Sequence, residues 1–304
     1  MNIIKPSKLK SGDTIGILSV SGGVSNYENI LRAKDFFVSQ GFKVKISETT
    51  SKHFRYMAGT DEERVKALED FFSDGDIDAI VCSRGGYGTL RIIDKINYDV
   101  IKNNPKIFAG YSDITILLAM IFKKTGLITF HGAMMNGDFG KEEINEYTKN
   151  SFFNTLQNEQ KDFYAKDNFE VLNSGSSEGI LWGGNLATLV SLIPNDFVPD
   201  EPLILFLEDL NEPVYKIDKM LTQLFNIPLI KKNVKGLVFG DFLDSGNDEQ
   251  LIELLKEVSS ELKVPSTFGF NITHGAEKDT LPYGVKVNFN ADRGLLRVEN
   301  SYLR

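Results

Sequence analysis

The chain has 304 residues, of which 41% are apolar and 25% charged, and its formal net charge is −8. That length allows two domains or one large domain with a sizeable core, and the composition is ordinary for a globular protein. The negative charge argues against nucleic acid or an anionic membrane as the main partner. The single cysteine, Cys82, excludes an intramolecular disulfide and fits a reducing compartment. Because no stretch resembles a secretion signal or is apolar enough to cross a bilayer, we expect a cytoplasmic protein.

The first half of the sequence alternates between patterns typical of strands and of helices. Apolar runs predict strands at residues 14–20, 42–46, 78–82, 107–109 and 127–130. Apolar periodicity with start and stop signals predicts helices at residues 26–40, 60–72 and 112–122, and a short helix toward Asp94. Strands that alternate with helices at this spacing indicate βαβ units, and hence a parallel sheet covered by helices.

The composition changes between residues 141 and 179, where Asn, Lys, Glu and Ser dominate and apolar periodicity fades. We place a domain boundary within residues 155–178, which predicts an N-terminal domain over 1–160 and a C-terminal domain over 175–304. The second half resumes with apolar patterns that predict strands at 179–185, 203–207, 236–239 and 264–270, and helices at 186–193, 215–225 and 249–262. Residues 285–289 and 294–298 alternate and predict an antiparallel hairpin.

Ser112 follows a short apolar strand and Gly110, and it begins an apolar-periodic segment. A serine at a turn from strand to helix lies where free backbone N–H groups can stabilise a developing negative charge. The hydrolase pattern Gly-x-Ser-x-Gly is only half met, because Ile114 replaces the second glycine. The alternative is that Ser112 caps the helix, and this stretch alone favours capping.

Glu208 follows the buried strand 203–207, and a carboxylate at the carboxyl end of such a strand lies where α/β folds place ligand sites. A solvated strand end is an equally good interpretation of that position. The chain has three histidines: His53 lies in a polar segment, whereas His131 and His274 each follow an apolar run. A Ser/Glu/His set needs one histidine at a turn, with its second nitrogen held by a carboxylate.

A glycine-rich run, Ser83 to Gly88, follows the third strand. It fails as a dinucleotide fingerprint because Arg91 stands where a glycine is needed, and no Walker lysine follows. It is either a turn whose bare N–H groups approach a ligand oxygen or a plain tight turn. The pattern Ser-x-x-Lys is excluded by Thr115. Since no His-Glu-x-x-His or Cys-x-x-Cys occurs, we expect neither a metal nor a cofactor.

Five motifs occur in a specific order and cover nearly the whole chain. They are Arg84-Gly-Gly-Tyr-Gly88, Gly110-Tyr-Ser-Asp-Ile-Thr115, Trp182-Gly-Gly-Asn185, Phe206-Leu-Glu-Asp209 and Gly269-x-x-x-x-His-Gly275. Together they resemble the LD-carboxypeptidase family, serine peptidases of murein recycling that are related to the microcin-immunity peptidases. The resemblance implies a nucleophile at Ser112, an acid at Glu208 and a base at His274. It also implies an α/β fold, with an N-terminal Rossmann-like parallel-sheet domain and a C-terminal β-rich α/β domain, and a homodimer.

The activity implied by the resemblance is release of the terminal D-alanine from a murein tetrapeptide in the cytoplasm. The compact spacing from Ser112 to Glu208 resembles the murein-recycling branch, because the immunity branch carries a longer insert there. We expect the oxyanion hole to use the backbone N–H of Asp113 and that of Gly85 or Gly86, with Gly86 preferred. Arg84 is a candidate for binding the substrate carboxylate, with a structural ion pair as the alternative. Acylated nucleotides, peptide antibiotics, or cleft binding without chemistry remain alternative functions.

Overall fold

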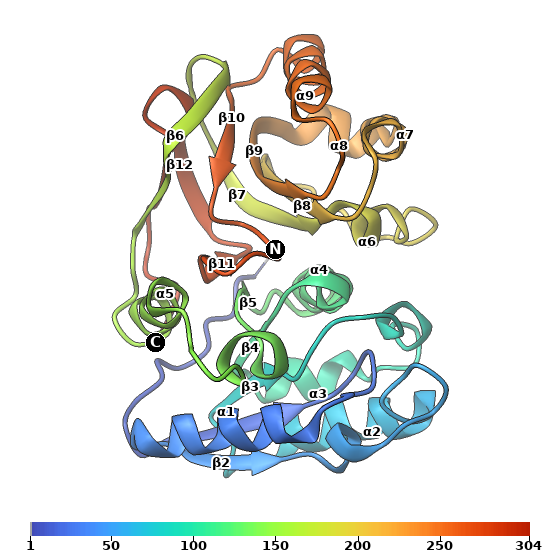
Figure 1. The fold of residues 1–304 in the computed structure, drawn as a ribbon, viewed down its shortest axis with the longest axis vertical. Helices are drawn as coiled ribbons and strands as arrows, with labels where there is room; N and C mark the ends of the chain where they lie inside the picture. Colours follow the sequence, from blue (N-terminus) through green and yellow to red (C-terminus); the bar gives the residue numbers. More distant parts are fainter. Residues whose placement is uncertain (1) are drawn as a thin grey trace. The chain divides into compact units, whose positions relative to one another are not determined.

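The computed structural model describes residues 2–304, and the chain divides into two compact units (Figure 1). The N-terminal unit comprises the chain up to Glu159 together with Asp279–Tyr283 and Tyr302–Arg304. The C-terminal unit comprises Gln160–Lys278 and Gly284–Ser301. Within residues 2–304, no helix has the length and apolar character needed to cross a membrane.

The N-terminal unit is built on a six-stranded sheet with the order β11-β5-β4-β3-β1-β2. Neighbouring strands run parallel except β11, which pairs antiparallel with β5. The central strands are short and fully buried, which is why their sequences are continuous apolar runs rather than alternating ones. The predicted parallel sheet is thereby confirmed. Its strands are β1 (Thr14–Leu18), β2 (Lys43–Ile46), β3 (Ala79–Cys82), β4 (Ile107–Gly110), β5 (Thr129–His131) and β11 (Leu281–Tyr283).

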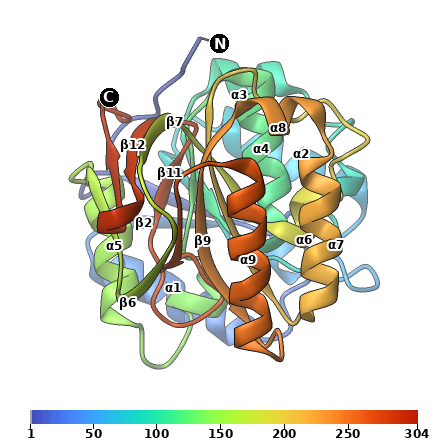
Figure 2. The same ribbon diagram turned by 90° about the horizontal axis from the view of Figure 1, so that it is seen from above.

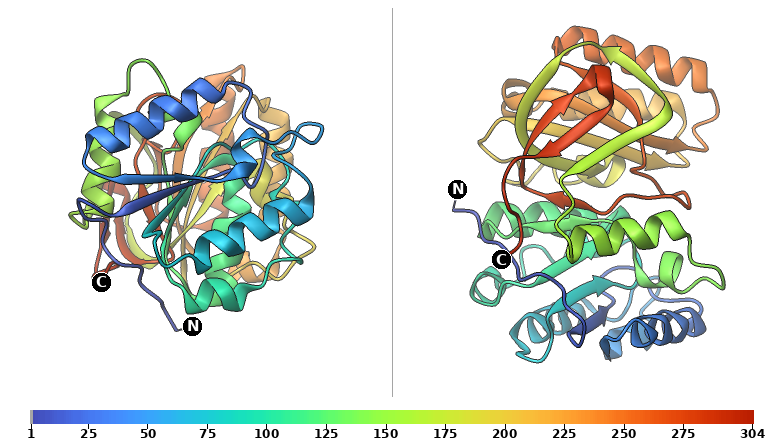
Figure 3. Two further views of the ribbon diagram at one scale, coloured as in Figure 1. Left: turned by 90° about the horizontal axis from the view of Figure 1, so that it is seen from below. Right: turned by 90° about the vertical axis from the view of Figure 1, so that its left-hand side faces the viewer.

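Helices cover this sheet, and α1 and α2 lie on opposite faces of it (Figure 3, left). On the face of α1, the rings of Phe37, Phe139 and Phe152 pack edge to face with centroids 4.8–5.7 Å apart. The short helix predicted toward Asp94 is instead a single 3-10 turn, Thr89–Arg91. The helices are α1 (Tyr27–Ser39), α2 (Asp61–Ser73), α3 (Tyr98–Asn103), α4 (Thr115–Thr125) and α5 (Glu146–Leu156).

The C-terminal unit is a closed seven-stranded barrel with the order β10-β6-β13-β12-β7-β8-β9. The strands from β7 through β8 and β9 to β10 run parallel, and the remaining pairs are antiparallel. The predicted hairpin is confirmed, since β12 and β13 pair with Val287 opposite Val298. The strands are β6 (Asp162–Asn173), β7 (Ser176–Asn185), β8 (Leu203–Leu210), β9 (Val234–Leu243), β10 (Ser266–Phe270), β12 (Lys286–Asn290) and β13 (Leu295–Val298).

Four helices of the C-terminal unit follow its parallel strands, and α7 and α9 lie beside each other (Figure 2). Their apolar faces carry the periodic residues that predict them, such as Ile217, Leu221 and Leu224 in α7. The helices are α6 (Leu186–Val190), α7 (Val214–Phe225), α8 (Pro228–Asn233) and α9 (Asp248–Leu262).

The division between the units differs in detail from the boundaries expected from sequence. The C-terminal unit begins at Gln160 rather than near residue 175, because β6 occupies residues 162–173. Most β6 side chains are half-buried or exposed, so polar residues are tolerated and apolar alternation is weak. The segment Asp279–Tyr283 returns to the N-terminal unit and supplies β11.

The returning segment is tied to α5 by hydroxyl groups. Asp279 is buried and accepts hydrogen bonds from Tyr147 Oη at 2.9 Å and Ser151 Oγ at 3.2 Å. Ser151 Oγ in turn accepts from the N–H of Thr280, whose carbonyl oxygen accepts from Thr155 Oγ1. Burial raises the pKa of Asp279 to about 7, although the two hydrogen bonds partly oppose that rise.

This raised pKa predicts a pH-dependent stability. An unfolded aspartate titrates near pH ~4, so between about pH 4 and about pH 7 the folded state holds a proton that the unfolded state releases. The contribution of Asp279 to the free energy of unfolding is therefore largest at low pH and is lost as the pH rises through this window. We expect Asp279→Asn to remove this contribution to the pH dependence, because an amide does not titrate.

Urea unfolding at about pH 5 and about pH 8 measures the effect. Between these values the midpoint of the wild type should fall relative to that of Asp279→Asn. The exposed Asp167 provides the control, since Asp167→Asn should follow the wild type. Identical pH dependence in the wild type and Asp279→Asn would contradict the prediction.

Candidate active site

Ser112 lies at the turn between β4 and α4, and its backbone is left-handed, with φ of +62°. Tyr111 before it is extended, so the chain reverses sharply at the serine. A left-handed residue other than glycine costs about 1–2 kcal/mol and persists only where its surroundings hold it. Ser112 does not cap α4, because that position is taken by Ile114 and has no side-chain hydrogen bond. The structure thus favours the strained turn over the capping interpretation.

The glycine-rich run after β3 packs directly against this serine. A Cβ atom added to Gly85 would lie 2.7 Å from Ser112 Cβ and 2.8 Å from Ser112 Oγ. The same position is 3.2 Å from the backbone nitrogen of Asp113. Only a glycine allows so close an approach of backbone to side chain. Gly86, with φ of +116°, continues the turn.

Asp113 fixes the backbone immediately after the serine. Its buried carboxylate accepts hydrogen bonds from Ser21 Oγ at 2.6 Å and from the N–H of Thr89 at 3.0 Å. Thr89 Oγ1 also donates to the carbonyl oxygen of Asp113 at 2.7 Å. Burial raises the pKa of Asp113, and the hydrogen bond from Ser21 opposes that rise. Loops after β1 and β3 therefore both hold the residue next to Ser112.

In the C-terminal unit, Glu208 and His274 form a hydrogen-bonded pair. Glu208 lies near the carboxyl end of β8 and is fully buried, and its Oε2 is 2.7 Å from His274 Nδ1. The His274 side chain is 14% exposed. A carboxylate at Nδ1 fixes the imidazole tautomer and leaves Nε2 able to accept a proton.

A close backbone approach brings the histidine segment to the barrel. A Cβ atom added to Gly240 of β9 would lie only 2.0 Å from the carbonyl oxygen of Ile272. The N–H of Asp241 donates to that same oxygen at 2.9 Å. The pairing of β8 with β9 shifts register at this level, between Leu207 and Asp209. Gly240 and the register shift thus allow the segment after β10 to reach the end of β8.

The neighbouring acid, Asp209, has different partners. Its carboxylate accepts from Asn185 Nδ2 at 3.0 Å and from the N–H of Ala187 at 2.9 Å, at the start of α6. Burial raises the pKa of Asp209 to about 6, and the negative charge of Glu208 adds to the rise. Asp209 therefore orders the Trp-Gly-Gly-Asn motif, whereas Glu208 holds the histidine.

The other candidate residues lie as follows. His131 is buried in β5, opposite Leu281 of β11, with its ring beside that of Tyr111. His53 is exposed in a loop. Arg84 donates from Nη1 to the carbonyl oxygen of Gly23 at 3.2 Å and makes no ion pair within residues 2–304. Across these same residues no cluster of three His, Cys, Asp or Glu side chains could hold a metal ion.

Sequence reasoning missed the residues that support this site from behind, among them Ser21, Thr89 and Gly240. Ser21 and Thr89 come from loops whose ends meet only in the folded sheet. A local signal was present for Gly240, since a glycine inside a strand pattern marks a bulge or a close backbone approach.

Two family models match the chain: the LD-carboxypeptidase N-terminal domain over residues 15–132 and the LD-carboxypeptidase C-terminal domain over residues 178–289. The probable murein peptide carboxypeptidase of Bacillus subtilis is 33% identical over 295 residues, which cover 94% of this chain and 91% of that protein. The microcin self-immunity protein MccF of Escherichia coli is 30% identical over 329 residues, covering 97% of this chain and 95% of that one.

The fold agrees with these sequence relationships. A solved structure of MccF in complex with glutamyl sulfamoyl guanosine matches this chain with a TM-score of 0.90 at 28% identity, covering 99% of each chain. The parallel-sheet unit and the mixed barrel are thus the arrangement found in a relative. From the matched domain models and the full-length relatives, the chain belongs to the LD-carboxypeptidase family.

Proposed function

We propose that this protein is a serine carboxypeptidase that releases the C-terminal D-alanine from murein tetrapeptides in peptidoglycan recycling. Ser112 is the nucleophile, His274 the general base and Glu208 the acid that orients it. The observation that carries the proposal is the 2.7 Å contact between Glu208 Oε2 and His274 Nδ1, in a chain of a serine peptidase family. The left-handed turn at Ser112 supports it, because such strain concentrates at functional sites.

In the proposed reaction, His274 Nε2 takes the proton from Ser112 Oγ as the oxygen attacks the scissile carbonyl. Glu208 stabilises the imidazolium that forms, and His274 then gives the proton to the leaving amine of D-alanine. A water molecule hydrolyses the acyl-enzyme by the same route. The chemistry needs no metal and no cofactor.

The N–H groups of Asp113 and Gly86 are the proposed oxyanion hole. The close fit of Gly85 against Ser112 and against the nitrogen of Asp113 supports this assignment. One donor of this kind is typically worth about 3 kcal/mol of transition-state stabilisation. Arg84, which lacks a carboxylate partner within residues 2–304, is the proposed ligand of the substrate carboxylate.

The compact spacing from Ser112 to Glu208 is our reason for proposing a murein peptide rather than a nucleotide substrate. The alignment with MccF spans 329 positions, more than the 304 residues of this chain, so the immunity protein carries residues that this chain lacks. The alignment with the murein peptide carboxypeptidase spans only 295. Cleavage of an acylated nucleotide or a peptide antibiotic is the second candidate, favoured by the TM-score of 0.90 with MccF. A homodimer and a cytoplasmic location stay predictions.

The substrate proposal predicts stereochemical selectivity. A tetrapeptide that ends in D-alanine should be cleaved, whereas its L-alanine diastereomer and its C-terminal amide should be poor substrates. Loss of a charge-assisted hydrogen bond to the carboxylate costs about 1.5–3 kcal/mol, which is roughly ten- to a hundredfold in rate. Mass spectrometry of each peptide before and after incubation measures the release.

Ser112→Ala is the control for that experiment, since it should abolish release from every peptide. Equal cleavage of the D- and L-terminated peptides would exclude the LD-carboxypeptidase activity even if Ser112 is required. Release of an acyl group from a nucleotide conjugate in place of alanine would favour the second candidate.

The proposed base is tested against the other histidine that follows a strand. Glu208→Gln and His274→Asn should each lower kcat on the order of 10²–10⁴-fold with little change in KM, because they remove the imidazolium or its support. His131→Asn should retain substantial activity. Steady-state kinetics on the tetrapeptide distinguishes them, and the opposite pattern would move the chemistry to His131.

Gly85 provides a steric test of the serine. Gly85→Ala places a methyl group 2.8 Å from Ser112 Oγ, so the labelling of Ser112 by a fluorophosphonate should slow by at least about tenfold. Gly75→Ala is the matched control, because no atom lies within 4 Å of the added methyl. Equal labelling rates for both variants would show that the fit of Gly85 does not matter to the reactivity of Ser112.

A further inference from the structure

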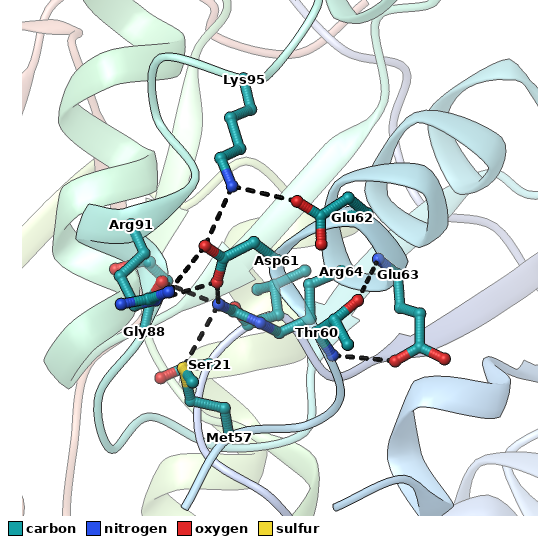
Figure 4. Close-up of polar contacts among 12 residues, drawn as sticks. Ser21, Met57, Thr60, Asp61, Glu62, Glu63, Arg64, Gly88, Arg91 and Lys95 are labelled. Atoms are coloured by element: carbon teal, nitrogen blue, oxygen red, sulfur yellow. Dashed lines mark hydrogen bonds and ion pairs between the residues drawn. The ribbon is translucent and has the colours of Figure 1, made fainter. Parts of the chain in front are cut away.

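Arg64 of α2 is a fully buried arginine whose guanidinium lies among backbone oxygens (Figure 4). Its Nη1 donates to the carbonyl oxygen of Val20 at 2.7 Å and to that of Gly88 at 2.8 Å. A Cβ atom added to Gly88 would lie 2.8 Å from the same Nη1, so that position admits only glycine. One nitrogen thereby joins the loop after β1 to the end of the glycine-rich run.

The other guanidinium nitrogen anchors the charge. Arg64 Nη2 donates to Asp61 Oδ1 at 2.7 Å and contacts Met57 Sδ at 3.4 Å. Asp61 also accepts two hydrogen bonds from Arg91, at 2.9 and 3.0 Å, and one from Lys95 at 3.0 Å. Asp61 therefore neutralises the buried guanidinium and fixes its plane, while Arg91 and Lys95 hold Asp61 from the more exposed side.

The two segments that Arg64 joins are those that hold Asp113. Ser21, which donates to the Asp113 carboxylate, is the residue after Val20. Thr89, which donates to both the carboxylate and the carbonyl of Asp113, is the residue after Gly88. Each loop is thus fastened to Arg64 at one residue and to the backbone beside Ser112 at the next.

We propose that Arg64 is a positioning residue for the Ser112 nucleophile. It sets the spacing between the loop after β1 and the glycine-rich run after β3, the two segments that hold Asp113. The inference rests on the proposed role of Ser112. Arg64 acts on the rate of attack by Ser112, and it touches neither substrate nor reacting atoms.

A lysine cannot replace this arginine. The planar guanidinium directs its donors toward two carbonyl oxygens and a carboxylate at once, whereas an ammonium is a compact charge on a flexible stem. Arg64→Lys therefore keeps the positive charge beside Asp61 and loses the link between the loops. Arg91→Lys is the matched control, since Arg91 bonds the same carboxylate but its side chain is 43% exposed, and within residues 2–304 its guanidinium hydrogen-bonds Asp61 alone.

The experiment measures the second-order rate constant for phosphonylation of Ser112 by a fluorophosphonate, together with kcat and KM on the tetrapeptide. Both are measured on the full chain, well below the unfolding midpoints of all variants. We expect Arg64→Lys to lower the phosphonylation rate constant and kcat by about ten- to a hundredfold with KM little changed, because small displacements of a nucleophile cost that much. Arg91→Lys should stay within about twofold, the effect expected of a surface ion pair.

Phosphonylation of folded Arg64→Lys at the wild-type rate would overturn the proposal, as would an equal loss in Arg91→Lys. If Arg64→Lys does not fold, Ser21→Ala decides the question, because it breaks one link from the loops to Asp113 while keeping Arg64. It should slow phosphonylation by at least about threefold, and an unchanged rate would overturn the proposal.

The fluorophosphonate separates this proposal from the proposed function. Arg64-dependent labelling of Ser112 without cleavage of the tetrapeptide would support the positioning role and refute the murein activity. Cleavage of the tetrapeptide, with a labelling rate that does not depend on Arg64, would support the murein activity and refute the positioning role. Absence of labelling in the wild type would refute both.

Discussion

The left-handed backbone at Ser112 is the constraint on which the N-terminal unit depends. A serine in this conformation is disfavoured by about 1–2 kcal/mol, so the residues around it must supply compensating contacts. The buried carboxylate of Asp113 supplies them through hydrogen bonds from Ser21 and Thr89. Because these donors come from loops after β1 and β3, the sharp turn after β4 cannot form without the neighbouring parallel strands. The strain at one residue thus links three strand ends of the sheet.

In the C-terminal unit, the position of the site residues depends on glycines that allow backbone segments to approach closely. Gly240 admits the carbonyl oxygen of Ile272, and Gly183, with φ of +151°, admits that of Phe206, since a Cβ there would lie 1.8 Å away. Both contacts lie at the carboxyl ends of the parallel strands β7 to β9. These backbone contacts bring the segments that carry Glu208 and His274 to that end, where the 2.7 Å contact between Glu208 Oε2 and His274 Nδ1 orients the two side chains.

Sequence patterns predicted the parallel sheet and the β12–β13 hairpin, because buried strands appear as apolar runs or alternations. The glycine-containing motifs were also visible, because tight turns need glycine at particular positions. Sequence patterns could not predict α5 (Glu146–Leu156), whose buried face mixes Thr148, Ser151 and Thr155 with the apolar Phe152 and Leu156, so that apolar periodicity is weak. The hydroxyl groups of Ser151 and Thr155 bond a segment more than 120 residues away in the chain, at Asp279 and Thr280. The sequence also contains a local indication that Arg64 is buried, which the sequence analysis did not use. This arginine shares a helix face with Leu68 and Phe72, and a charge on an apolar stripe indicates a buried partner.

The return of Asp279–Tyr283 to the first sheet has a consequence for synthesis on the ribosome. Strand β5 pairs with β4 on one side and with β11 on the other, and β11 is translated some 150 residues later. Until then the N-terminal unit has an open sheet edge at β5, and exposed edges promote pairing with other chains. Folding of the N-terminal unit therefore cannot finish until the segment that contains β11 has been synthesised.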